Sequence, residues 1–466
     1  MAAEKTENQK FLENVGLPRK SGWNNYQGAK RKQVDEFSEE YMDFLGKAKT
    51  ERECAELIVK SLKSSGFKPI EDFKTLKPGD KVYKYFRNKV VLASVIGSSP
   101  SFHLIGNHMD CPRLDLKPHP ISEASNLSFL RTHYYGGIKK YQWVNVPLAM
   151  HGVVYTKSNK KIEFALGEDD KDPCFMVSDL LVHLAKKQLE KKAEDVIEGE
   201  QLSIIAGNIP VDDPSIEQKV KFMVLKHLYE KYGICEEDFS AAEIEFVPAV
   251  KPRDVGFDRS MIAAYGHDDR SCSFALLKSI QQVEKPAYTA VAGFFDKEEI
   301  GSIGDTSASS FVLRNFLEEL SKKRGETQEF TQIIENSDSI SADVTSGMNP
   351  NFTDEFDPEN VSLLGNGVSV EKYGGQRGKA MSNDASAEYF QKIRQLLDKN
   401  KIAWQTGEIS KVDVGGGGTI AMFLSNLGMN SIDAGPCVLG MHAPVELISK
   451  LDLYCAHLLY NAFFKE

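Results

Sequence analysis

The sequence predicts an α/β protein built on a mixed sheet that helices flank. Strand-like apolar runs alternate with amphipathic helical runs along the chain, a pattern typical of a sheet covered by helices. Several apolar runs end in charged or imidazole side chains, as expected where strand ends carry a site. The length of 466 residues exceeds one ordinary core, so roughly two or three domains are expected.

Three apolar runs are predicted to be strands that end at polar sites. They cover residues 101–110, 287–302 and 428–444, and each begins as a buried strand before reaching charged or imidazole side chains. Because ligands gather at the carboxyl ends of strands in α/β sheets, these strand ends are expected to converge in space.

Helices are predicted between and after these strands. Residues 307–324 place Phe316 and Leu320 on one face, and Gly325 follows as a stop signal. Residues 385–400 and 445–464 show the same helical pattern.

The stretch 119–254 differs from the rest and is predicted to be a separate inserted domain, rich in β-structure. It contains aromatic-rich strands at 132–146, a hairpin-like run at 148–164 and two helices, at 179–194 and 214–233. A connector of that length is implausible inside one compact domain. The predicted catalytic domain is therefore discontinuous, formed by residues 1–118 and 255–466.

Composition and charge exclude several function classes. The net charge of −10 argues against a nucleic-acid partner, because a phosphate-binding surface needs an excess of lysine and arginine. No run approaches the roughly 18 to 20 apolar residues of a membrane span, so no membrane partner is expected. Residues 1–20 contain no apolar core of a signal peptide, and secretion is not expected.

The cysteines indicate the compartment. All seven are dispersed, odd in number and never arranged as CxxC. This pattern favours reduced thiols over a disulfide framework or a structural zinc knuckle. A cytoplasmic location is therefore expected.

Two short motifs suggest metal ligation. His108 and Asp110 lie two apart at a strand end and point the same way, so the carboxylate can orient a metal-binding imidazole. The pair Asp268-Asp269 precedes a helical run. It is read either as a helix cap or as the source of a carboxylate that bridges two metal ions.

The adjacent glutamates Glu298 and Glu299 follow a buried aromatic strand. Like charges held together there cost energy unless a cation is present. One glutamate can then ligate zinc while its neighbour accepts a proton from water. Neither Asp343 nor His442, each in a turn after a strand, is informative by itself. Together the order His, Asp, Glu-Glu, Asp, His supplies nitrogen and oxygen ligands for two zinc ions without cysteine.

The chain resembles the aminopeptidase I and aspartyl aminopeptidase family of dinuclear zinc peptidases. The resemblance runs from GLPRKSGWNNY to the C-terminal helix and is most specific in GNHMDCPRLDLKP, GHDDRSCSFALL, GFFDKEEIGS, ISADV and DAGPCVLGMHAPVEL. It implies one zinc ion held by His108 and Asp343 and another held by Glu299 and His442. Asp268 would bridge them. It also implies Glu298 as general base and Asp110 as the carboxylate that orients His108.

The same resemblance implies a further set of properties for the whole molecule. The insert would be a dimerisation domain, and the partners would be peptide substrates and other copies of the chain, assembled from dimers into a tetrahedral dodecamer. His183 of the insert would reach a neighbouring subunit's active site. The cofactors would be two Zn²⁺ per subunit, with Co²⁺ or Mn²⁺ as substitutes.

Two departures favour the aminopeptidase I-like branch over acidic-residue specificity. After Asp343, where many relatives have two histidines, the chain has Ser346 and Asn349. The glycine run 415–418 replaces a cysteine-containing turn.

Substrate contacts are predicted at two places. Within the glycine run, Gly417 is interpreted as a close backbone approach to the substrate, with a flexible turn as the alternative. No phosphate-loop motif is present. Lys372 is predicted to line the same pocket, with a surface lysine as the alternative.

The predicted function is therefore removal of N-terminal residues from peptides. Two other classes remain open from the residues alone. One is another dinuclear amidohydrolase, such as a carboxypeptidase or a deacylase. The other is a non-catalytic scaffold derived from a peptidase.

Overall fold

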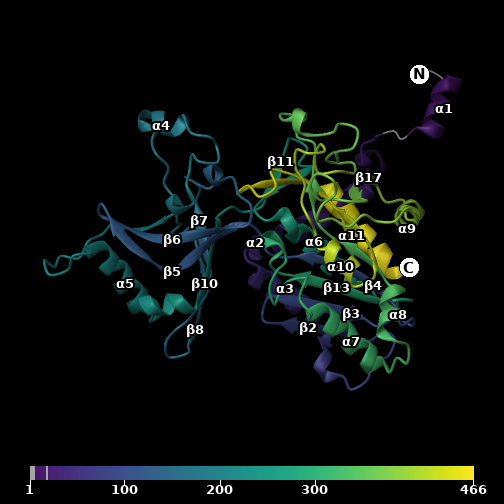
Figure 1. The fold of residues 1–466 in the computed structure, drawn as a ribbon, viewed down its shortest axis with the longest axis horizontal. Helices are drawn as coiled ribbons and strands as arrows, with labels where there is room; N and C mark the ends of the chain where they lie inside the picture. Colours follow the sequence, from purple (N-terminus) through teal and green to yellow (C-terminus); the bar gives the residue numbers. More distant parts are fainter. Residues whose placement is uncertain (1–5, 17–18) are drawn as a thin grey trace.

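A nine-stranded mixed sheet lies at the centre of the computed structural model, which describes residues 6–16 and 19–466 (Figure 1). Its strands, in spatial order, are β1 (Lys68–Pro69), β2 (Lys81–Phe86), β3 (Val90–Val95), β13 (Thr289–Phe295), β4 (Phe102–His108), β14 (Asp338–Ser341), β18 (Asn430–Gly435), β16 (Val368–Glu371) and β17 (Trp404–Thr406).

The four strands β13, β4, β14 and β18 are parallel neighbours. Their carboxyl ends therefore lie along one edge of the sheet. Antiparallel neighbours complete the sheet on both sides, with β3 against β13 and β16 against β18. The predicted convergence of strand ends is confirmed, as is the α/β fold with a mixed sheet.

Helices cover both faces of this sheet. Alternate residues of a strand point to opposite faces, so Leu104 packs with one helical layer and Ile105 with the other. The layer on the Ile105 side comprises α2 (Ala29–Lys47), α3 (Glu51–Ser64), α6 (His267–Gln281), α9 (Ala387–Lys399) and α11 (Lys450–Lys465). The opposite layer comprises α7 (Val312–Arg324), α8 (Phe330–Glu335) and α10 (Ala421–Asn426). The N-terminal α1 spans Glu7–Val15.

A second sheet, of six strands, stands to one side of the central sheet (Figure 1). Its strands are β8 (Lys161–Leu166), β7 (Leu148–Tyr155), β10 (Ala242–Pro248), β5 (Arg113–Ala124), β6 (Leu127–Tyr135) and β9 (Ile204–Gly207). Helix α5 (Lys219–Tyr232) packs against it. The predicted hairpin at 148–164 corresponds to β7 and β8. The predicted start of the insert, residue 119, falls inside β5.

A third sheet, of five short strands, supports two of the candidate ligands. Its strands are β11 (Arg253–Val255), β12 (Met261–Ala264), β20 (Glu446–Ser449), β19 (Cys437–Leu439) and β15 (Thr345–Ser346). The chain leaves β12 just before Asp268 and leaves β19 just before His442.

Three predicted helices begin five residues later than expected. Helix α7 begins at Val312 because Ser307 and Ser310 donate their hydroxyls to nearby backbone carbonyls, which competes with helix formation. Helix α5 begins at Lys219 rather than 214. Helix α11 begins at Lys450 because residues 446–449 pair as β20.

The helix predicted at 179–194 is largely absent. The chain forms a 3-10 turn at Val182–Leu184 and a single turn, α4, at Lys186–Leu189. Val182 is 73% exposed and Leu181, Leu184 and Leu189 are exposed as well. Without a buried face to pack against, a short helix gains little stability.

Among the described residues, no helix is long and apolar enough to cross a bilayer. The expectation that residues 1–20 contain no signal peptide concerns in part residues 1–5 and 17–18, which lie outside the described residues. All seven cysteines are free thiols.

Candidate metal centre

The predicted ligands meet at the carboxyl ends of the parallel strands. His108 is the last residue of β4 and lies beside Phe295, the last residue of β13. Glu298 and Glu299 follow in a 3-10 turn. Asp343 comes directly after β14. The sheet therefore brings together side chains that are far apart in the sequence.

His108 presents one ring nitrogen to the centre of this cluster. Its Nδ1 lies 3.0 Å from the Asp110 carbonyl oxygen and 3.3 Å from the Asp110 carboxylate. Its Nε2 lies 3.2 Å from Asp268 Oδ1, 3.7 Å from Asp343 Oδ1 and 3.8 Å from Glu298 Oε2. Asp110 thus orients the ring so that Nε2 faces the carboxylates.

His442 faces the same cluster from the other side. Its Nδ1 donates to the Gly137 carbonyl at 2.7 Å. Its Nε2 lies 3.2 Å from Asp268 Oδ2 and 3.3 Å from Glu299 Oε2. Asp268 therefore offers one carboxylate oxygen to each histidine side, which is the arrangement that a bridging ligand needs.

The backbone that carries these side chains is held by two further carboxylates. Asp110 accepts the backbone N–H groups of Glu298 and Glu299, each at 3.1 Å. Glu446 accepts the N–H of Asp268 at 3.1 Å and that of His442 at 2.8 Å. Each carboxylate fixes two positions of the cluster at once.

The residues fit zinc. Two triads have ligand atoms within 4.8 Å of one another: His108, Asp268 and Glu299, and His108, Glu298 and Asp343. Imidazole nitrogen and carboxylate oxygen are ordinary zinc ligands. Glu299 Oε1 is buried and has no hydrogen-bond partner among the described residues. An unpaired buried carboxylate oxygen of this kind is expected where a cation binds.

The charges of the cluster also favour the binding of a cation. Burial, reinforced by the carboxylates of Asp343 and Asp110, raises the pKa of Glu298 to about 8. Burial and the neighbouring Asp268 carboxylate raise the pKa of Glu299 well above its usual range. Burial opposes protonation of His442, but its contacts with Asp268 and Glu299 raise its pKa to about 10. Carboxylates outnumber cationic side chains here, so positive charge from outside the chain would stabilise their ionised forms.

A cavity of about 560 Å³ opens onto the cluster. Gly417 lines it, and no side-chain atom would meet a Cβ there within 4 Å. The apolar lining residues are Val344, Met381, Ile409, Met422, Phe423 and Met441. No lysine or arginine of the described chain is among the lining residues.

Two predicted substrate contacts do not line this cavity within the subunit. Lys372 is exposed, and its Nζ lies 3.7 Å from Asp384 Oδ1. His183 lies in an exposed 3-10 turn of the inserted sheet's periphery. Neither lines the cavity of its own chain.

Sequence reasoning missed two carboxylates of the site. Glu371 lines the cavity at the end of β16, and the Thr345 hydroxyl donates to it. Its signal was the apolar run VSVE, another strand with a carboxylate at its end. Glu446 lies four residues after His442, but only the tertiary fold shows that it also bonds to Asp268.

Known proteins share both the sequence and the fold. The model of the family described as aminopeptidase I zinc metalloprotease (M18) matches residues 44–464. A relative from Clostridium acetobutylicum, named "probable M18 family aminopeptidase 1", is 45% identical over 453 residues, covering 95% of this chain and 97% of the relative. The crystal structure of an M18-family aminopeptidase from Thermotoga maritima superposes with a TM-score of 0.93 at 41% identity, covering 96% of this chain and 99% of that one.

A more distant structure shares the fold alone. The S. cerevisiae mApe1 dodecamer is 20% identical, with a TM-score of 0.75, and covers 93% of this chain and 97% of that one.

Proposed function

This chain belongs to the aminopeptidase I (M18) family of zinc metalloproteases, and we propose that it removes the N-terminal residue from peptides in the cavity beside His108 and His442. The family makes it a metalloaminopeptidase, a hydrolase of peptide bonds. The observation that carries the proposal is the cluster of histidine and carboxylate ligand atoms at the cavity floor.

Two zinc ions per subunit fit the donor set. His108 and Asp343 would hold one ion, and Glu299 and His442 the other. Asp268 would bridge them, since its two oxygens face the two histidines at 3.2 Å each. Co²⁺ or Mn²⁺ would substitute, because ligand sets of this kind do not select zinc by affinity alone.

Glu298 is proposed as the general base. Zinc would supply Lewis-acid polarisation of the scissile carbonyl and lower the pKa of water toward neutrality. Glu298 lies at the cavity wall, where its carboxylate can take the proton of the attacking water and pass it to the leaving amine. Asp110 holds Glu298 in place through its backbone N–H.

Glu371 is proposed to recognise the substrate's free amino terminus. It is buried at the cavity wall, and none of the ion pairs among the described residues involves it. A buried carboxylate without a cationic partner is costly, and a peptide α-ammonium supplies the missing charge. Because no lysine or arginine of the described residues lines the cavity, an acidic side chain would lack a partner, so neutral and apolar residues are the proposed substrates.

The insert, residues 119–254, is proposed to be a dimerisation and lid domain. Its exposed apolar residues around His183 would be covered by a second copy of the chain. The distant mApe1 relative is a dodecamer, and a tetrahedral dodecamer built from dimers is the proposed assembly. The free cysteines suit the proposed cytoplasmic location.

A carboxypeptidase or deacylase and a non-catalytic scaffold are the competing functions. The family model and relatives are aminopeptidases, and none of the proposed metal ligands is missing from the sequence. Neither alternative has a comparable observation in its favour.

The test is a substrate panel with matched variants. Leucyl, alanyl, aspartyl and N-acetyl-leucyl chromogenic substrates would be assayed with zinc, cobalt or manganese. We expect leucyl and alanyl substrates to be hydrolysed, aspartyl substrates more slowly, and N-acetyl-leucyl substrates hardly at all. Glu298→Gln should lose a factor of about 10² to 10⁴ in kcat yet keep its metal. Glu371→Gln should act mainly by raising KM.

Several results would overturn the proposal. Faster hydrolysis of the N-acetylated substrate would indicate a deacylase. Near-normal turnover by Glu298→Gln would remove Glu298 as the base. If Glu371→Gln preferred free over acylated substrates to the same degree as the unmodified protein, Glu371 would be excluded as the amine-binding residue.

A further inference from the structure

The end of strand β6 brings the second sheet into direct contact with the metal centre of the same subunit. Tyr135 is the last residue of β6, and its hydroxyl donates to Asp110 Oδ2 at 2.8 Å. Two residues later, the Gly137 carbonyl accepts the Nδ1–H of His442 at 2.7 Å. One short segment, residues 135–137, thus contacts both halves of the centre.

The residue between these two contacts lies against a predicted ligand. Gly136 has φ of +72°, and a Cβ placed there would lie 3.4 Å from Glu299 Oε2 and 3.3 Å from Pro112 Cγ. The backbone of Gly136 therefore borders the Glu299 carboxylate directly. A methyl group at this position would be in tight contact with both Pro112 and Glu299.

Each contact acts on an atom that sets the geometry of the centre. Asp110 accepts both backbone N–H groups of Glu298 and Glu299 and faces His108 Nδ1. The Tyr135 hydroxyl fixes the rotation of that carboxylate. The Gly137 carbonyl requires a proton on His442 Nδ1, so the neutral imidazole keeps its lone pair on Nε2, the nitrogen that faces the carboxylates. Outer partners of this kind fix the tautomer and orientation of metal ligands.

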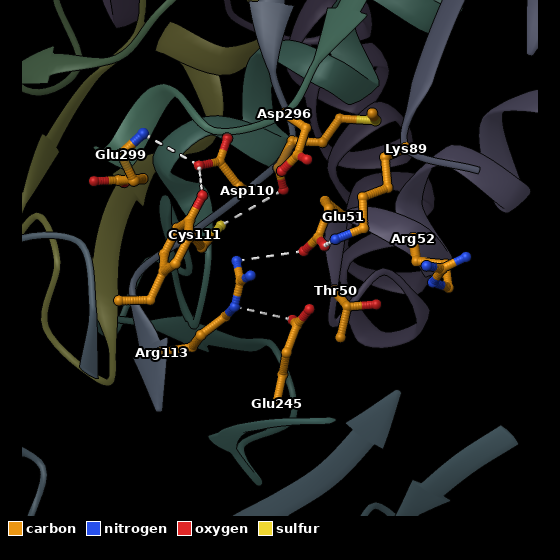
Figure 2. A network of polar contacts seen from close by, with 12 residues as sticks. Thr50, Glu51, Arg52, Lys89, Asp110, Cys111, Arg113, Glu245, Asp296 and Glu299 are labelled. Carbon is orange, nitrogen blue, oxygen red and sulfur yellow. Dashed lines mark hydrogen bonds and ion pairs between the residues drawn. The ribbon is translucent and has the colours of Figure 1, made fainter. Parts of the chain in front are cut away.

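The segment is itself anchored by a buried ion network (Figure 2). Arg113 pairs with Tyr135 in the ladder between β5 and β6, and its guanidinium lies 3.8 Å from the centre of the Tyr135 ring. Figure 2 shows Arg113 between Glu51 of α3 and Glu245 of β10. Its Nη1 lies 3.3 Å from Glu51 Oε2, and its Nε lies 3.2 Å from Glu245 Oε2. Lys89 contacts Glu51 at 2.7 Å.

This network spans the boundary between the two sheets. Glu51 and Lys89 belong to the part of the chain around the central sheet, whereas Arg113 and Glu245 belong to strands of the second sheet. All four side chains are largely buried. Removing one partner would leave another charge unpaired in the interior, which is strongly destabilising. These ion pairs therefore fix the position of the second sheet, relative to the central sheet, at the point where it contacts the metal centre.

We propose that residues 135–137 form a positioning segment. Through this segment, the position of the second sheet sets the geometry and metal affinity of the centre on both its His108 side and its His442 side. Tyr135 acts on Asp110, Gly136 on Glu299 and Gly137 on His442. None of the three is a metal ligand or a catalytic residue. The proposal rests on the ligand assignment made above.

Tyr135→Phe tests the segment with little change of shape, because it removes only the hydroxyl. Tyr134→Phe is the matched control, since Tyr134 is 38% exposed and its hydroxyl makes no hydrogen bond among the described residues. Zinc affinity would be measured by chelator competition on metal-depleted protein, and the ligand field by the visible spectrum of the cobalt form. We expect Tyr135→Phe to bind zinc about 10- to 100-fold more weakly and to shift the cobalt bands, while Tyr134→Phe does neither.

A second pair of variants guards against a folding defect in Tyr135→Phe. Gly136→Ala adds a methyl group against Glu299. Its control is Gly233→Ala, where φ is +73° but a Cβ meets nothing within 4 Å. Both alanines would have to adopt a similar positive φ, and only Gly136→Ala is expected to weaken zinc binding and move the cobalt bands. Thermal unfolding of the metal-free proteins shows which variants are folded.

The outcomes separate this proposal from the function on which it rests. Zinc affinity and cobalt spectra unchanged in both Tyr135→Phe and Gly136→Ala would overturn the positioning role, provided Asp268→Ala still loses metal. If Asp268→Ala bound zinc as tightly as the unmodified protein, the ligand assignment itself would be wrong.

Discussion

Asp268 and Asp269 are adjacent acidic residues with different surroundings. Asp268 faces His108 and His442 through its two oxygens. Asp269 lies toward Asn107, whose amide is 3.4 Å from Asp269 Oδ2, and its Oδ1 has no partner among the described residues. A bridging role therefore suits Asp268, the first of the pair, and not its neighbour.

Asp268→Ala is predicted to lose more metal than Asp343→Ala. A bridging carboxylate serves two ions, whereas Asp343 faces only the His108 side of the cluster. Metal content would be measured after dialysis at fixed free zinc, with Asp269→Asn as the control. Equal loss from Asp268→Ala and Asp343→Ala, or a larger loss from Asp269→Asn, would place the bridge elsewhere.

At the residue scale, the sequence indicates side chains better than backbone partners. The metal ligands could be proposed from their joint order at successive strand ends and from the resemblance of the surrounding motifs to a zinc-peptidase family; they are His108, Asp268, Glu299, Asp343 and His442. The Gly137 carbonyl could not be found, because every residue carries a carbonyl and only tertiary packing chooses its donor. The same holds for the Tyr135 hydroxyl, whose sequence context indicates only a strand.

At the scale of elements, strand ends were predicted well and isolated helices poorly. The parallel pairing of β4, β13 and β14 follows from apolar runs that must be buried on both faces. The segment 179–194 had a helical composition, but its apolar side chains are exposed. Helix formation there depends on a packing partner that composition does not describe.

One contact between the second sheet and a helix beside the central sheet depends on the protonation of a buried histidine, and so on pH. His151 of β7 is 2% exposed. Its Nδ1 lies 2.8 Å from Glu53 of α3, and its Nε2 lies 3.2 Å from Glu168. Lys49 reaches Glu168 at 3.5 Å, and Glu245 is the cross-strand neighbour of His151. Burial opposes protonation, but the bonds to Glu168 and Glu53 raise the pKa of His151 to about 9.

The protein is predicted to lose stability as the pH rises from about 6.5 to 9. His151 has a higher pKa in the folded state than the usual value of about 6.5, so its contribution is complete below pH 6.5 and lost as the pH passes through 9. The loss is at most about 3 kcal/mol. Urea unfolding of metal-free protein at several pH values would be compared with His151→Gln. Parallel curves for the two proteins would show that His151 does not carry the effect.

At the scale of the whole molecule, the exposed surface around His183 needs an explanation. Val182 and Leu184 flank His183 in one exposed turn, and Leu189 follows on α4. A cluster of exposed apolar side chains is a typical subunit contact. His183 does not line its own subunit's cavity, so a role in catalysis requires a neighbouring subunit's site.

We therefore predict that His183→Ala lowers kcat without releasing zinc, and that activity returns when this variant shares an oligomer with Glu298→Gln. In a mixed oligomer, some sites combine the intact Glu298 of the first variant with the intact His183 of the second. The two variants would be dissociated, mixed and reassembled, and their activity compared with each variant treated alone. Sedimentation would establish that mixed oligomers had formed, and metal analysis that zinc was retained. Mixed oligomers no more active than the separate variants would exclude a site shared between subunits, because every histidine would then serve only its own chain or none.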